Sequence, residues 1–150
     1  MSHSFPHTDL ERIIGAFRYD AHPMAMLCSS FAALGSFHAE ANPALQGQKL
    51  YSSGSEASLQ AMDKQIYRLI GKAPTLAAMA YRVRQGRPFN RPPSGLSYAA
   101  SFLYQIDKLG DTVGPDGKPE PFSVHPVFER AIDILLCVRP SLSLVQLIDR

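Results

Sequence analysis

Apolar residues recur along most of the chain with the three-to-four-residue spacing of an amphipathic helix, and no segment keeps the two-residue period of a strand for long. Stretches rich in glycine and proline interrupt this pattern, and helices are expected to end there. We therefore predict an all-α fold without a significant β-sheet. The predicted helices cover Asp9–Phe17, His22–Phe37, Leu59–Ile70, Thr75–Gln85, Ser97–Leu109 and His125–Val138.

Local signals place the ends of these helices. Thr8 and Glu11 have the spacing of a capping box, which predicts that the Thr8 hydroxyl caps the first helix. His-Pro pairs at His22 and His125 mark two further starts, because proline suits the first helical turn and pushes the preceding residue out of the helix. The stretch Gly71-Lys72-Ala73-Pro74 predicts a break between the third and fourth helices. Gly86 and Gly110 are expected to end the fourth and fifth helices, and Pro140 the last.

Four of the helices have a face that is predicted to turn inward. These faces are Met24, Leu27, Phe31 and Leu34; then Leu59, Met62, Ile66 and Leu69; then Tyr98, Phe102, Leu103 and Ile106; and finally Phe128, Ala131, Ile132, Leu135 and Leu136. Glycine, proline and polar residues dominate three connecting segments. Glu40–Ala57 is predicted to be an exposed connection with room for one short turn, Arg87–Ser97 an irregular crossing, and Asp111–Phe122 a solvated loop.

The second helix also carries a line of small residues, spaced by four, three and four, on the side away from its apolar face. Small side chains at this spacing let another helix approach closely, so we expect this helix to be wrapped on all sides. The line consists of Ala25, Ser29, Ala32 and Ser36.

Composition and net charge limit the kinds of protein and partner that need to be considered. A length of 150 residues, with 45% hydrophobic and 19% charged residues, indicates one folded domain. The net charge of +2 disfavours nucleic acid as a partner, and the many small and polar residues between Ala21 and Ala39 disfavour a membrane span. Cys28 and Cys137 lie apart in apolar stretches and are expected to be buried thiols.

Few residues point to a catalytic or ligand-binding role by themselves. The sequence has no phosphate-binding loop, no nucleophile elbow and no zinc-protease motif. His22 and His125 are expected to cap helices, His38 to be a cation at a helix end, and His3 and His7 to form an unstructured terminal pair rather than a metal site. A cluster of four arginines is expected to form a solvated rim, although guanidinium groups also suit carboxylates and phosphates. These are Arg82, Arg84, Arg87 and Arg91.

Taken in order, several short motifs resemble the middle of citrate synthase, in the form found in its bacterial and glyoxysomal members. The motifs run through nearly the whole chain, from about Ser2 to Val138. They are Asp20-Ala21-His22-Pro23-Met24, Asn42-Pro43-Ala44-Leu45, Lys72-Ala73-Pro74-Thr75 with Ala77-Ala78, Leu96-Ser97-Tyr98 with Phe102-Leu103, and His125-Pro126 with Arg130-Ala131-Ile132-Asp133. We therefore predict a partial large domain over 1–138 and an unrelated tail over 139–150.

The resemblance implies a multi-helical domain and a homodimer built from antiparallel helices. The small residues of the second helix, together with Ala77 and Ala78 of the fourth, would then lie at the dimer interface. The family condenses acetyl-CoA with oxaloacetate, using an aspartate base, two histidines and several arginines. It implies no cofactor or metal held by these 150 residues, and it leaves the cellular compartment open.

Two departures from the family pattern affect the site. The stretch that directly extends the last helix in the family reads His-x-Asp/Glu-His-Glu, whereas this chain has Arg139-Pro140-Ser141-Leu142-Ser143, with Leu142 in the place of the catalytic histidine. Ala100 stands where animal-type members place a histidine that contacts oxaloacetate. We therefore predict no catalytic, cofactor-binding or metal-binding residue in this chain and no activity of the chain alone.

Two alternatives stay open at this stage. The chain could be a non-catalytic module that associates with itself or with full-length subunits through the interface helices. It could also derive from 2-methylcitrate synthase, which uses propionyl-CoA, because the residues that choose the acyl donor are not present.

Overall fold

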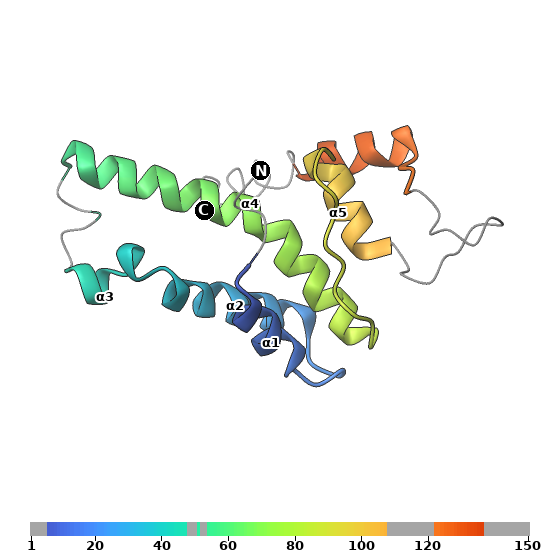
Figure 1. The fold of residues 1–150 in the computed structure, drawn as a ribbon, viewed down its shortest axis with the longest axis horizontal. Helices are drawn as coiled ribbons and strands as arrows, with labels where there is room; N and C mark the ends of the chain where they lie inside the picture. The colour runs from blue at the N-terminus through green and yellow to red at the C-terminus, as the bar shows by residue number, and fades with distance from the viewer. Residues whose placement is uncertain (1–5, 48–50, 52–53, 108–121, 137–150) are drawn as a thin grey trace, which may run out of the picture. The chain divides into compact units, whose positions relative to one another are not determined.

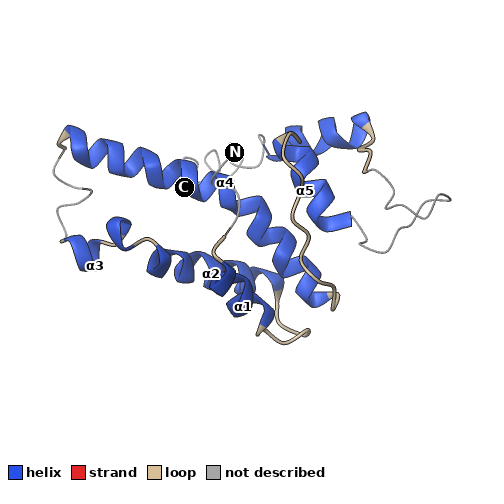
Figure 2. Ribbon diagram, in the orientation of Figure 1, coloured by secondary structure: helices blue, strands red, loops and turns tan. Residues whose placement is uncertain are grey.

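A computed structural model of the chain describes residues 6–47, 51, 54–107 and 122–136. The described residues are helical or irregular and contain no strand, which confirms the predicted all-α class (Figures 1 and 2). The chain divides into two compact units, Met1–Phe89 and Asn90–Arg150, and each is described by itself. No helix among the described residues is both long and apolar enough to cross a membrane.

The first helix of the first unit, α1 (Thr8–Gly15), buries Leu10 and Ile14. Its cap is His7, whose Nδ1 accepts a hydrogen bond from the backbone N–H of Asp9 at 3.2 Å. The predicted capping box was therefore wrong, because the helix begins one residue earlier and Thr8 lies inside it. His7 also stacks on Phe37, with ring centroids 5.3 Å apart, so it is not part of an unstructured terminus.

The second helix, α2 (Pro23–Leu34), begins at the predicted His-Pro pair. His22 Nδ1 accepts a hydrogen bond from the backbone N–H of Met24 at 3.2 Å, which confirms the capping role of this histidine. The buried positions of α2 are Met26, Ser30 and Leu34, whereas Met24, which was expected to turn inward, is exposed. Ser30 is accommodated because its hydroxyl donates to the Met26 carbonyl within the same helix.

Three short turns follow α2: η1 (Gly35–Phe37), η2 (Ala39–Ala41) and α3 (Pro43–Gln46). Asn42 caps α3, since its side chain accepts from the backbone N–H of Ala44. The described part of the predicted exposed connection therefore contains two turns of helix, and its last residues already belong to the next helix.

The longest element, α4 (Glu56–Arg84), runs through the predicted break as one helix with Pro74 in its interior. The prediction of two helices was wrong here, although the ribbon changes direction along α4 in Figure 1, as expected of a helix with an internal proline. Gly86 ends α4 as predicted. Its φ of +66° and the hydrogen bonds Arg87 N–H to Arg82 O and Gly86 N–H to Val83 O form a Schellman motif.

The core of the first unit lies where α1, α2 and the second half of α4 meet. Figure 1 shows α2 running beside α4, with α1 against both. The buried apolar cluster consists of Leu10, Ile14, Met26, Leu34, Leu76, Met79 and Ala80.

The second unit contains α5 (Tyr98–Asp107) and a helix over 126–136. The Ser97 hydroxyl accepts from the backbone N–H of Ala100 at 3.1 Å, which confirms Ser97 as the predicted cap of α5. His125 Nδ1 accepts from the backbone N–H of Val127, so the second His-Pro pair also caps its helix as predicted. The predicted helix end at Leu109, the loop after it, the stop at Pro140 and the boundary at 138 lie outside the described residues.

Candidate functional site

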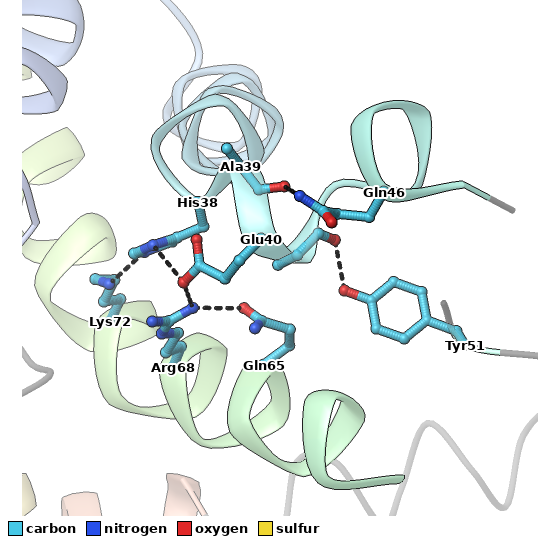
Figure 3. A network of polar contacts seen from close by, with 9 residues as sticks. His38, Ala39, Glu40, Gln46, Tyr51, Gln65, Arg68 and Lys72 are labelled. Atoms are coloured by element: carbon cyan, nitrogen blue, oxygen red, sulfur yellow. Dashed lines mark hydrogen bonds and ion pairs between the residues drawn. The ribbon is translucent and has the colours of Figure 1, made fainter. Parts of the chain in front are cut away.

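A network of polar side chains joins the turns after α2 to the first half of α4 (Figure 3). Lys72 Nζ lies 3.1 Å from His38 Nε2, and an Arg68 guanidinium nitrogen lies 2.7 Å from a Glu40 carboxylate oxygen. The same Arg68 nitrogen donates to Gln65 at 3.3 Å. Residues 38 and 40 come from the turns, whereas 65, 68 and 72 share one side of α4, so the network ties the two segments together.

Burial decides the charge states in this network. Burial first, and then the nearby charges of Lys72 and Arg68, lower the pKa of His38 below its ordinary value. Lys72 is buried, and burial together with Arg68 lowers the pKa of its ammonium group as well. The hydrogen bond from Arg68 lowers the pKa of Glu40. His38 is therefore neutral near pH 7, which corrects the expectation of a cationic imidazole at this helix end.

A cavity of about 200 Å³ adjoins the network. Arg68 lies on its wall and is buried, and its Nε has no hydrogen-bond partner among the described residues. No group of three or more potential metal ligands occurs in the described parts of the chain. Arg68 gives the wall of this cavity a positive charge, and its contacts with Glu40 and Gln65 hold the side chain in place. The cavity is lined by Phe31, Leu34, Gly35, His38, Ala41, Tyr51, Gln65, Arg68 and Leu69.

Sequence reasoning did not single out Arg68, Lys72 or Glu40. A signal was present, since Arg68 and Lys72 are four residues apart and thus stand on one helix face. That face borders the apolar stripe of the same helix, since Leu69 lines the cavity together with Arg68. What the spacing could not show is that the face is covered, because the covering residue His38 lies 34 positions away in sequence.

The arginine cluster does not form a uniform solvated rim. Arg84 and Arg87 are exposed, as predicted, and so is Arg91 in the second unit. Arg82, in contrast, is only 2% exposed, and its Nε donates to the carbonyl of Pro88. Burial and the charge of Arg87 lower the pKa of Arg82. This side chain thus fastens the segment after α4 to the helix and is not available to bind a ligand.

The small residues of α2 lie on an exposed face. Ala25, Ser29, Ala32 and Ser36 are all exposed, so within this chain α2 is not wrapped on all sides, contrary to the expectation. The Ser36 hydroxyl donates to the carbonyl of Ala33, so this donor is already satisfied. Cys28 is an exposed free thiol rather than a buried one, and Cys137 lies outside the described residues.

The remaining predicted interface residues lie on α4. Ala77 is half-buried and Ala78 is buried, at 1% exposure. Of the six predicted positions, the three on α2 and Ser36 of η1 therefore form the accessible face. Their assignment to a dimer interface stays a prediction.

In the second unit, Ser97 at the start of α5 and Glu129 of the helix over 126–136 form a polar contact. The Ser97 hydroxyl donates to the Glu129 carboxylate, and both line an open cavity of about 270 Å³. The Ser97 hydroxyl thus accepts a hydrogen bond at the start of α5 and donates one to Glu129, so it links α5 to the following helix. Ala100, the second departure noted in the sequence, is buried on α5.

The described residues thus define the class of the protein, which is an all-α helical domain. The comparisons give the family. The profile described as "Citrate synthase, C-terminal domain" matches residues 1–139. The chain therefore belongs to the citrate synthase family, as the resemblance indicated.

Individual relatives agree with this assignment. The chain is 49% identical over 135 residues to a peroxisomal citrate synthase of Dictyostelium discoideum, and 47% identical over 138 residues to a second citrate synthase of that organism. It is 47% identical over 133 residues to a glyoxysomal citrate synthase of Cucurbita maxima. These matches cover 90%, 92% and 89% of this chain but only 25%, 24% and 23% of the relatives. The chain thus spans about a quarter of the length of the curated relatives that it matches.

Proposed function

We propose that these 150 residues serve as part of the helical scaffold of a citrate synthase, the enzyme that condenses acetyl-CoA with oxaloacetate, and that they do not catalyse the reaction alone. The observation that carries the proposal is Leu142 in the place of the family's catalytic histidine. Deprotonation of the acetyl methyl group needs a positioned base, and the resulting enolate needs a hydrogen-bond donor.

The expected result of an activity assay is therefore background turnover. The purified chain is mixed with acetyl-CoA and oxaloacetate, and loss of the thioester absorbance is followed, with a full-length citrate synthase as the positive control. A parallel reaction with propionyl-CoA covers the 2-methylcitrate alternative. Oxaloacetate-dependent thioester cleavage that scales with the concentration of the purified chain would contradict the proposal.

A second function is supported by the exposed face of α2. We infer that this face, formed by the four small residues Ala25, Ser29, Ala32 and Ser36, associates with a second copy of the chain or with a full-length subunit. Small side chains allow close approach of a facing helix, and the Ser36 hydroxyl is already bonded to the Ala33 carbonyl, which lowers the cost of desolvating it. Citrate synthases are typically dimeric, and this surface is the place where such a contact would form.

Ala32→Glu tests this interface directly. We expect the substitution to weaken association by roughly 100-fold or more, because a helix–helix contact would bury an unpaired carboxylate at a cost of about 3 kcal/mol or more. Association is measured by analytical ultracentrifugation of the chain alone and mixed with a full-length subunit. Ala57→Glu, at an exposed position in the first turn of α4, is the matched control and should change nothing. Equal association of both variants, or a parent chain that stays monomeric in both experiments, would rule the interface out.

A further inference from the structure

The side chains of His38 and Glu40 attach the segment that follows α2 to α4, and Phe37 at the start of this segment packs against the core cluster. His38 separates η1 from η2, and its φ of −130° and ψ of 70° take the chain out of the helical direction at that point. Residues 35–46 then continue as short turns with local backbone hydrogen bonds, such as Ala41 N–H to His38 O at 2.8 Å. Within them, the Gln46 side chain bonds to the Ala39 carbonyl at 3.4 Å, and Tyr51 donates to the Ala41 carbonyl.

Two polar side-chain contacts among the described residues connect this segment to α4. One is the hydrogen bond between Lys72 Nζ and His38 Nε2, and the other is the ion pair between Arg68 and Glu40 (Figure 3). A lysine ammonium group has three donors and no acceptor, so His38 Nε2 must be the acceptor. That role is open only to the neutral imidazole, because both ring nitrogens of the cationic form carry a proton.

The charges that face His38 oppose its protonation. Lys64, Arg68 and Lys72 of α4 are cations, and Glu40 of η2 is the single carboxylate among the charges that act on the ring. The other elements at this place, α2, η1 and α3, contain no charged residue. The Glu40 oxygen lies 3.9 Å from His38 Nδ1 and is already paired with Arg68, so it offsets the cations only in part.

We propose that His38 is a proton-sensitive latch, whose protonation on acidification breaks its bond to Lys72 and releases the turns over 35–46 from α4. The cation formed on His38 would stand directly against the Lys72 ammonium group, and separation of the two segments relieves that repulsion. The ion pair of Glu40 and Arg68 limits how far the segment moves, so the opening is local.

The direction of the pH effect follows from linkage. In the closed state the pKa of His38 is lowered, and in the open state it returns toward its ordinary value of 6.5. The open state therefore binds more protons between these two values. Neutral His38 therefore contributes fully to the stability of the closed state above pH 6.5. This contribution is lost as the pH falls toward the lowered pKa of His38.

Hydrogen–deuterium exchange of the full 150-residue chain tests the latch. Exchange is measured at about pH 7.5 and about pH 5.5, corrected for the intrinsic rate, with peptides from α1 as the internal reference. We expect protection of residues 35–46 to fall roughly tenfold at the lower pH, since a hydrogen bond to a charged group is replaced by repulsion.

In His38→Gln the amide oxygen can still accept from Lys72 but does not titrate, so protection should be the same at both pH values. His22→Asn, which keeps a helix-capping side chain, should behave as the parent does.

A second test needs no variant. It is an NMR titration of the histidine ring protons in the unsubstituted chain. The expected midpoint for His38 is below 6.5. A midpoint at or above that value overturns the proposal. So does protection of 35–46 that is the same at both pH values in the parent, or that falls equally in His38→Gln.

Discussion

Replacing Leu76 by alanine is expected to lower the free energy of unfolding of the first unit by about 3 kcal/mol, within the range of large-to-small substitutions in cores. Leu76 is fully buried in the cluster formed by α1, α2 and α4. The substitution removes apolar contacts and leaves a cavity that the helices close only in part, because the core spans three separate elements. Urea unfolding followed by far-ultraviolet circular dichroism measures the change.

Leu69→Ala is the matched control for this experiment. It makes the same chemical change in the same helix, seven positions earlier, but Leu69 is 43% exposed. We expect it to cost less than about 1 kcal/mol, because much of the side chain is in water in either state. Equal losses for the two variants would show that the second half of α4 does not pack on α1 and α2 as described.

Arg82→Ala is expected to lower the free energy of unfolding by about 2 kcal/mol, the range for a hydrogen bond made by a charged donor. The side chain is 2% exposed, and its Nε donates to the carbonyl of Pro88. Truncation therefore loses that bond and the packing of the long stem, and it leaves the Pro88 carbonyl to find water. The same urea titration gives the free energy, and faster proteolysis after α4 reports release of the segment.

Arg84→Ala is the control for Arg82. Arg84 lies two residues later in the last turn of α4 and is exposed, so its loss should cost only a few tenths of a kcal/mol through the helix dipole. If Arg82→Ala were as mild as Arg84→Ala, the fastening role of the buried arginine would be wrong.

Much of the fold could be predicted from the sequence, because its signals are local. The apolar periodicity and the His-Pro pairs at His22 and His125 located helix starts correctly, and Gly86 located an end. Pro74 misled the prediction, since a proline inside a helix normally marks a boundary. Here the residues on both sides of it are held by tertiary contacts: Lys72 by His38, and Leu76 and Met79 by the core. Those contacts favour one continuous, bent helix.

The polar network could not be predicted in the same way. Its central bond joins His38 to Lys72, 34 residues apart, and nothing local specifies that approach. The predicted charge of His38 was wrong for the same reason: a helix end favours the cation, but burial and three neighbouring cations lower the pKa of His38. Periodicity likewise shows which side of a helix is apolar but not what covers it. The predicted inward face of the first half of α4 is thus exposed in this chain.

That exposed face, formed by Leu59, Met62, Ile66 and Leu69, bears on how long the isolated chain can persist in a cell. Holdase chaperones and quality-control proteases bind contiguous apolar surfaces of this kind. The steady-state amount of the free chain should therefore depend on how fast another surface takes it up, and overproduction beyond that supply should yield aggregates rather than soluble protein.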